Sequence, residues 1–338
     1  MYFVVPDAID DPDRVSGGNL YDQRVREGLR SSGWDVRMVL IPRGSGSLAA
    51  LTMSRLPDGA LTLIDGLIAV RESDALMQHS SRLRIVVLAH MVASLPGERE
   101  ALRAARRIIA TSGWTRSELI SLGFAEPHDV VVAYPGTDPA ATTVASRSGG
   151  RLLCVGVVAP HKGQDLLIRA LARLTDVDGW TCELVGSLDQ APAFVDELMQ
   201  TIQRTNLATR ATFTGILTGR SLESAYGRAD LVVVPSRNES FSMVVSEALA
   251  RGIPVLAARV GGIPEAMSST AAGILVPPDD PWALEVVLRQ WWASSERRTE
   301  LKRAAVEADE TVRPWSATVA VIASILHEVA LSETAVSA

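Results

Sequence analysis

Short apolar runs alternate with helix-length amphipathic segments along most of the chain. In the first half, the predicted strands are residues 1–6, 35–42, 61–69 and 84–91. A helix is predicted over residues 20–33, and a helix running into a strand over residues 98–113. The runs are continuously apolar, which is typical of strands buried on both faces of a parallel sheet. The pattern therefore predicts a doubly wound α/β domain.

The pattern is interrupted at residues 134–150, which are rich in Gly, Pro, Thr and Ser and predict a linker. It then starts again. The predicted strands of the second half are residues 151–158, 180–186, 210–215, 231–236 and 254–258. The predicted helices are residues 164–174, 191–205, 221–229, 242–251 and 282–295, followed by a helical C-terminal segment. Ligands of such sheets collect at the carboxyl ends of the strands, so the loops after strands are the places to search.

Chain length and net charge limit the number of domains and the kinds of partner. A chain of 338 residues is long for one core, which favours two domains, assigned to residues 1–140 and 151–312, with residues 313–338 as a separate C-terminal segment. The formal charge of −6 argues against nucleic acid as a partner. The acidic N-terminal sequence predicts no secretory leader, and the apolar runs are too short to span a bilayer. Cys154 and Cys182 lie in apolar runs, and we expect buried thiols in a reducing cytoplasm.

Two glutamates mark the most informative stretch, residues 231–265. Glu239 lies in a polar turn after an apolar strand, and Glu247 lies within the helix predicted over residues 242–251. The amide groups at the start of that helix form an anion site. Carboxylates beside an anion site suit a ligand with phosphate in the middle and hydroxyls at both ends, such as a nucleotide-sugar. The alternative is a surface cap and a solvated helix position.

This stretch resembles the retaining glycosyltransferases of family 4, which have the GT-B fold of two Rossmann-like domains facing across a cleft. Their two glutamates are separated by seven residues, as Glu239 and Glu247 are. The resemblance implies that Glu239 holds the donor sugar, that Glu247 holds the ribose, and that the backbone of Phe241, Ser242 and Met243 meets the pyrophosphate or sugar. It also implies that the last helix crosses back to the N-terminal domain.

A second signal is the loop after the strand at residues 151–158. Lys162 opens the next helix and supplies a positive charge to a diphosphate. The family has an arginine where this chain has Val157, and His161 is a partial substitute. Lys162 as a solvated loop residue is the alternative. The departure at Val157 leaves open whether the leaving diphosphate is fully neutralised.

Three weaker signals complete the predicted site. Gly17 and Gly18 follow the first strand and its loop, where the family has a glycine pair beside the donor. The alternative is an ordinary tight turn, which would have the same sequence pattern. His90 ends an apolar strand and is either a core histidine or, by the resemblance, a residue beside the donor sugar that makes a hydrogen bond to the sugar or the acceptor. Gly215 and Ile216 follow a strand and could line the nucleobase. No histidine spacing is typical of a metal site.

The sequence thus predicts a metal-independent, retaining glycosyltransferase in the cytoplasm, with His90, Lys162 and Glu239 as catalytic residues. Its donor would be a nucleotide-diphosphate sugar, bound without a separate cofactor. Its acceptor would be a hydroxyl of a small molecule or glycan, attacked from the front face. Two alternatives stay open: a nucleotide-sugar-binding protein without transfer activity, and a nucleotide-sugar epimerase.

Overall fold

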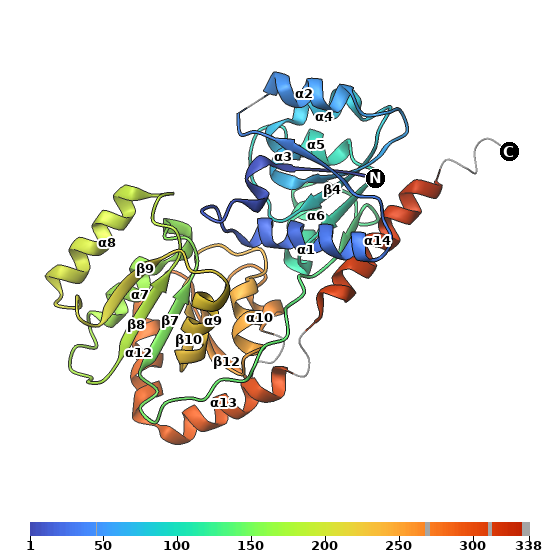
Figure 1. Cartoon of the computed structure of the whole chain (residues 1–338). Helices are drawn as coiled ribbons and strands as arrows, with labels where there is room; N and C mark the ends of the chain where they lie inside the picture. Colours follow the sequence, from blue (N-terminus) through green and yellow to red (C-terminus); the bar gives the residue numbers. More distant parts are fainter. Residues whose placement is uncertain (45, 268–270, 310–312, 333–338) are drawn as a thin grey trace. The chain divides into compact units, whose positions relative to one another are not determined.

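The computed structural model describes residues 1–44, 46–267, 271–309 and 313–332, and these divide into two compact α/β units (Figure 1). The first unit comprises residues 1–136 and 313–332, and the second comprises residues 137–309. The last helix of the chain, α14 (Trp315–Leu331), therefore belongs to the first unit. The last residues of the predicted second domain, 310–312, and the end of the predicted C-terminal segment, 333–338, lie outside the described residues.

The first unit is built on a parallel sheet with the strand order β2-β1-β3-β4-β5-β6. Its strands are β1 (Tyr2–Pro6), β2 (Arg37–Ile41), β3 (Leu61–Asp65), β4 (Arg84–Ala89), β5 (Arg107–Ala110) and β6 (Val130–Val132). Its helices, besides α14, are α1 (Gly17–Ser31), α2 (Gly46–Ser54), α3 (Gly66–Arg71), α4 (Ser73–His79), α5 (Glu98–Arg103) and α6 (Gly113–Ser121), with a 3₁₀ turn at Asp7–Asp10.

One predicted strand is wrong in its extent. The run at residues 61–69 divides at Asp65: β3 ends there and α3 begins at Gly66. The carboxylate of Asp65 accepts a hydrogen bond from the amide of Ile68 at 3.0 Å and so caps the helix. The glycine pair Gly17–Gly18 is likewise not in a loop but in the first turn of α1, which Ser16 caps.

The second unit is built on a parallel sheet with the strand order β12-β11-β10-β7-β8-β9. Its strands are β7 (Arg151–Val155), β8 (Thr181–Val185), β9 (Ala211–Gly215), β10 (Leu231–Val234), β11 (Val255–Ala258) and β12 (Gly273–Val276). Its helices are α7 (Gln164–Leu171), α8 (Pro192–Arg204), α9 (Gly219–Arg228), α10 (Met243–Leu249), α11 (Ile263–Ala266), α12 (Pro281–Ala293) and α13 (Ser295–Asp309), with a 3₁₀ turn at Pro160–Lys162.

Burial explains why the strands lack apolar–polar alternation. All four residues of β10 and of β11 are buried, and so are five of the six residues of β4. Helices cover both faces of each sheet, so side chains that point to either face are removed from water. In the first unit, α14 packs against α1; a Cβ at Gly28 of α1 would stand 2.3 Å from Cγ2 of Val319.

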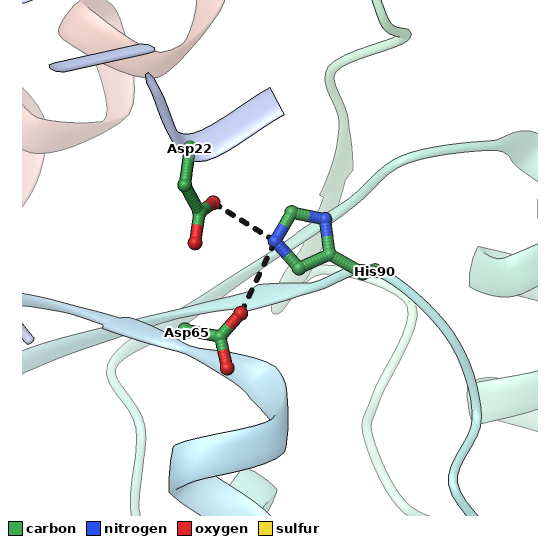
Figure 2. Close-up of side chains that lie close together, drawn as sticks. All are labelled: Asp22, Asp65 and His90. Carbon is green, nitrogen blue, oxygen red and sulfur yellow. Dashed lines mark hydrogen bonds and ion pairs between the residues drawn. The ribbon is translucent and has the colours of Figure 1, made fainter. Parts of the chain in front are cut away.

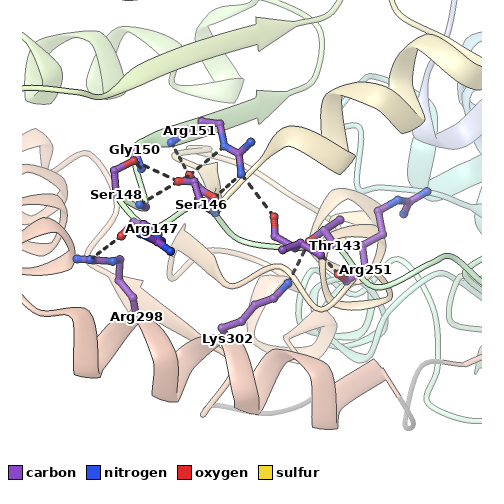
Figure 3. Close-up of polar contacts among 12 residues, drawn as sticks. Thr143, Ser146, Arg147, Ser148, Gly150, Arg151, Arg251, Arg298 and Lys302 are labelled. Carbon is purple, nitrogen blue, oxygen red and sulfur yellow. Dashed lines mark hydrogen bonds and ion pairs between the residues drawn. The ribbon is translucent and has the colours of Figure 1, made fainter.

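The predicted linker is largely attached to the second unit (Figure 3). The amide of Thr143 donates to the carbonyl of Arg251 at 3.0 Å, and Lys302 Nζ donates to Thr143 Oγ1 at 3.0 Å. Ser146 Oγ and the guanidinium of Arg151 both donate to the carboxylate of Asp230. Residues from Thr143 onward are therefore part of the second unit's packing.

No helix among the described residues combines the length and the apolarity needed to cross a bilayer.

Candidate active site

The two sheets each have a point where the chain's strand order reverses. In the second sheet this point lies between β7 and β10, and in the first it lies between β1 and β3. The loops after these strands leave toward opposite faces of the sheet, which opens a crevice at the carboxyl edge where doubly wound folds bind ligands. Lys162 follows β7 and Glu239 follows β10, so both predicted residues belong to the reversal point of the second sheet.

Lys162 and Glu239 form a direct ion pair. The distance from Lys162 Nζ to Glu239 Oε1 is 2.7 Å, and Ser236 Oγ donates to the same oxygen at 2.9 Å. The lysine side chain is 24% exposed and the glutamate side chain 11% exposed. Both side chains of the pair are therefore partly accessible to solvent, as a site for a polar ligand requires.

Glycines allow the loops around this pair to pack closely. Gly163 has a φ of +68°, and a Cβ there would stand 2.1 Å from the carbonyl oxygen of Pro235. Gly261 has a φ of +52°, and a Cβ there would stand 1.7 Å from the carbonyl oxygen of Glu239. Side chains at these positions would push apart the loops after β7, β10 and β11. The close approach thus fixes the backbone that carries Glu239.

Arg237 joins the same loops through its side chain. Its guanidinium makes two parallel hydrogen bonds to Asp165 of α7, at 2.7 and 2.8 Å, and donates to the carbonyl of Pro160 at 2.7 Å. Its Nε contacts Asp279 at 2.5 Å. These hydrogen bonds raise the pKa of Arg237. Arg237 is thus a fixed cation that holds the loop of Lys162 against the loop of Glu239.

Replacing Arg237 with lysine is expected to lower the free energy of unfolding by about 1.5–3 kcal/mol. Lysine keeps the charge, but its ammonium cannot form the planar pair of bonds to Asp165. The measurement is the midpoint of urea unfolding. The control is Arg303→Ala on α13, whose exposed pair with Glu307 is worth at most about 1 kcal/mol. Equal midpoint shifts in R237K and R303A would contradict the assigned role.

The start of α10 has an unusual backbone. Ser242, the residue before the helix, has a φ of +79° and is buried, and Phe241 beside it is buried as well. Ser242 Oγ has no hydrogen-bond partner among the described residues. A buried hydroxyl without a partner is rare and suggests that a ligand or water completes its hydrogen bonding. Met243 is the first residue of α10 and is partly exposed.

Glu247 makes its side-chain hydrogen bond with a residue of α9 within the second unit. Its Oε2 accepts a hydrogen bond from Tyr226 Oη of α9 at 2.7 Å. Burial raises the pKa of Glu247, although the tyrosine hydroxyl and Arg251 act in the opposite direction. The carboxylate of Glu247 is therefore held in place by the Tyr226 hydroxyl, and Glu247 is not a freely solvated residue on the helix surface.

Val157 and His161 leave the site with little extra positive charge. Val157 lies in the turn after β7, and its carbonyl accepts a hydrogen bond from the buried side chain of Gln164 at 2.9 Å. Partial burial, together with the charge of Lys162, lowers the pKa of His161, so its imidazole is neutral at pH 7. This shift of the pKa disfavours a positive charge on His161, the predicted partial substitute for the missing arginine. Its carbonyl instead accepts the amide of Arg237 at 2.8 Å.

Gly215 and Ile216 lie at the end of β9, the edge strand of the second sheet. Gly215 has a φ of +74° with open space around it, and its carbonyl accepts the amide of Gly186 at 2.9 Å. Two strands, β7 and β8, precede β9 in that half of the sheet. Both residues therefore share the carboxyl edge with Lys162, as their predicted role beside a base requires.

In the first unit, His90 is bonded to two buried carboxylates (Figure 2). Its Nε2 lies 2.9 Å from Asp22 Oδ1 and 3.3 Å from Asp65 Oδ2. The histidine side chain is 12% exposed, against 1% and 4% for the two aspartates. The first turn of α1 lies beside the ring, since a Cβ at Gly18 would stand 3.6 Å from His90 Cδ2. Gly17, one residue earlier, is exposed.

Several functional candidates escaped the sequence reasoning. Asp22 shares a helix face with the buried Val25 and Leu29, and a carboxylate on an apolar face is a signal that could have found it. Asp65 is the last residue of the buried strand β3, but it was hidden inside the run predicted as one strand. Arg237 and Tyr226 gave no signal of their own, because their partners are distant in sequence.

The second unit of the chain matches a known protein family. Residues 146–308 match the family described as Glycosyl transferases group 1. The D-inositol 3-phosphate glycosyltransferase of Mycolicibacterium gilvum (strain PYR-GCK) is 34% identical over 234 residues, which cover 66% of this chain and 52% of that protein. That of Kineococcus radiotolerans (strain ATCC BAA-149 / DSM 14245 / SRS30216) is 34% identical over 231 residues, 61% and 53% of the two chains. The chain spans about half the length of the curated relatives it matches.

Solved structures share the whole architecture. Sucrose-phosphate synthase from Thermosynechococcus elongatus superimposes with a TM-score of 0.79 at 21% identity, over 97% of this chain and 98% of that one. Anabaena Alr3699/HepE in complex with UDP-glucose gives 0.78 at 20% identity, over 97% and 99%. The fold is GT-B. The two Rossmann-like units predicted for a GT-B chain are thereby confirmed, and the second unit carries the group 1 similarity.

Proposed function

We propose that this protein is a retaining, metal-independent glycosyltransferase that moves a hexosyl unit from a nucleoside-diphosphate sugar to a hydroxyl acceptor. The observation that carries the proposal is the Lys162–Glu239 pair at the reversal point of the second sheet. A cation beside a carboxylate suits the junction of such a donor, where a diphosphate meets sugar hydroxyls. The similarity of residues 146–308 to group 1 glycosyl transferases supports it.

Each end of the donor has a partner in this arrangement. Lys162 and the amides at the start of α10 would bind the diphosphate, and the unpartnered Ser242 Oγ would donate to it or to the sugar. Glu239 would accept from sugar hydroxyls and Glu247 from ribose hydroxyls. Gly215 and Ile216 would flank the base. Anabaena Alr3699/HepE, a structural neighbour, has been solved with UDP-glucose, which supports a nucleotide-sugar in a fold of this kind.

The proposed reaction needs no nucleophile from the protein. The bond between the anomeric carbon and the diphosphate oxygen breaks, and the acceptor oxygen forms its bond to that carbon on the same face. The acceptor's proton passes to the departing diphosphate. Lys162 stabilises the negative charge that grows on the diphosphate, where a fixed charge contributes most.

A binder without transfer activity is the second candidate, and Val157 is the observation that favours it. The site's cation Lys162 is already paired with Glu239, Arg237 is engaged with Asp165 and Asp279, and His161 is neutral at pH 7. The leaving diphosphate thus meets less positive charge than in family members with an arginine at position 157.

Proton NMR of reaction mixtures tests the proposal. The enzyme is incubated with UDP- and GDP-sugars and a panel of hydroxyl acceptors, with and without EDTA. We expect a glycoside with the anomeric configuration of the donor, formed equally well with EDTA. Inverted configuration would refute retention, and a loss of activity in EDTA would refute metal independence. Donor binding without transfer or hydrolysis would favour the binder, and conversion of the sugar into its epimer would identify an epimerase.

A further inference from the structure

The cluster of Asp22, Asp65 and His90 lies at the strand-order reversal of the first sheet. Asp22 is on α1, which follows β1, and Asp65 ends β3, the neighbouring strand. His90 follows β4 directly. Three chemically active side chains thus meet at the edge where a doubly wound sheet binds ligands. The Lys162–Glu239 site belongs to the other unit, so this cluster needs a role of its own.

One atom of the histidine faces both carboxylates. Nε2 is 2.9 Å from Asp22 and 3.3 Å from Asp65, which are hydrogen-bond lengths. An ionised carboxylate can accept hydrogen bonds but cannot donate them. Nε2 must therefore carry the proton in its hydrogen bonds with the two aspartates. The other ring nitrogen, Nδ1, lies on the side of the ring that faces away from both carboxylates (Figure 2). Nδ1 has no hydrogen-bond partner among the residues that the structure describes.

The other described neighbours of His90 include the uncharged residues Tyr21 and Thr111. Tyr21 of α1 meets the ring edge-on at 5.2 Å, and its hydroxyl donates to the carbonyl of Ala133. Thr111, at the end of β5, donates to the carbonyl of His90 at 3.2 Å. From α14, Trp315 reaches Tyr21 and not the imidazole. Among the residues that the structure describes, the charged groups that contact the ring are the two aspartates, and both favour the protonated imidazole.

We propose that Asp22 and Asp65 are positioning residues that hold His90 as an imidazolium and direct its Nδ1–H toward the substrate. His90 then acts as a charged hydrogen-bond donor to an oxygen of the donor sugar or acceptor, and it cannot act as a general base. This inference rests on the proposed function only for the identity of the oxygen. The charge state itself is a property of the folded first unit and is measured without any substrate.

The electrostatics agree with the geometry. Burial alone would lower the pKa of His90, but the two carboxylates outweigh it and raise the pKa to about 10. Burial raises the pKa of Asp22 to about 7, against the attraction of His90. Because the folded pKa of His90 is above its unfolded value near 6.5, its stabilising contribution is complete below about pH 6.5. It is lost as the pH rises through about 10.

The test is a pH titration of the histidine side chains by NMR in the full-length protein labelled with ¹³C-histidine. The chain has five histidines, and the signal missing from His90→Gln identifies His90. We expect the His90 signal to stay in its protonated position through pH 9. Titration near pH 6.5 in the unsubstituted protein would overturn the proposal, whatever the protein's activity.

Two variants test the effect of each aspartate on the pKa of His90 separately. Asp65→Asn keeps the helix cap to Ile68, because asparagine caps as well as aspartate does, and Asp22→Asn keeps the shape of the buried side chain. Each is expected to lower the pKa of His90 by at least one unit. The control is Asp10→Asn, an exposed aspartate of the same unit that pairs with Arg26 and should leave His90 unchanged. Asp65→Asn tests the proposal by itself if Asp22→Asn fails to fold.

The pH profile of sugar transfer gives the second readout. The alkaline limit of activity should lie near pH 10 in the unsubstituted enzyme and move toward neutral pH in Asp22→Asn and Asp65→Asn. A purely structural role of the aspartates would lower activity equally at every pH and would contradict the proposal. So would a bound divalent cation, shown by stoichiometric metal in the purified protein that is lost in Asp22→Asn.

Discussion

Replacing Lys162 with alanine is expected to lower kcat for sugar transfer by about 100- to 1,000-fold, the usual cost of removing one fixed group that stabilises transition-state charge. The Lys162 side chain is partly exposed, and it reaches Glu239 across the reversal point of the second sheet. With Val157 nearby instead of arginine, little else replaces its charge. The measurement is the steady-state release of nucleoside diphosphate with saturating donor.

Two variants control for this result. Lys162→Arg keeps the charge but alters its geometry, so it should lose less activity than alanine. Arg289→Ala on α12 removes an exposed arginine that pairs with Asp176 and should leave kcat unchanged. If Lys162→Ala keeps kcat within about threefold of the unsubstituted enzyme, Lys162 is a solvated loop residue and the proposed catalysis is wrong.

Replacing Glu239 with glutamine is expected to reduce kcat by about 100-fold, or about 2.7 kcal/mol, while affinity for a nucleoside diphosphate is kept or increases. Glutamine retains an oxygen for Ser236 to donate to, but it loses the charge that orients Lys162. Lys162 is then freer to bind phosphate. The measurement compares kcat with the Kd of the diphosphate by calorimetry.

The comparison variant is Glu247→Gln, which should affect donor binding more than kcat. Its partner is Tyr226, and its proposed role is to hold the ribose, so donor KM should rise more than kcat falls. Because Lys162 and Glu239 are in contact, the double variant should lose less activity than the two single losses multiplied. Fully multiplicative losses would show that the ion pair does not act as one unit.

The strands of both sheets could be predicted because burial on both faces leaves a continuous apolar run, as in β10 and β11. The run at residues 61–69 shows where this signal fails. β3 and the buried side of α3 are both apolar, and only the capping role of Asp65 separates them. A one-residue boundary of that kind depends on a side-chain hydrogen bond, which periodicity does not record.

The candidate site could be predicted to the level of single loops. Lys162 and Glu239 were found because each follows an apolar strand, and their ion pair follows from the adjacency of β7 and β10. That adjacency joins residues 77 positions apart and is fixed only by strand order. The roles of Arg237 and Tyr226 could not be predicted for the same reason.

Whether the chain binds a nucleoside-diphosphate sugar through Lys162 and Glu247 can be measured by isothermal titration calorimetry with nucleoside diphosphates and their sugars. We expect saturable binding of one donor per chain, weakened both by Glu247→Gln and by Lys162→Ala. Absence of heat with UDP, GDP, ADP and their sugars, or binding that neither variant alters, would contradict it.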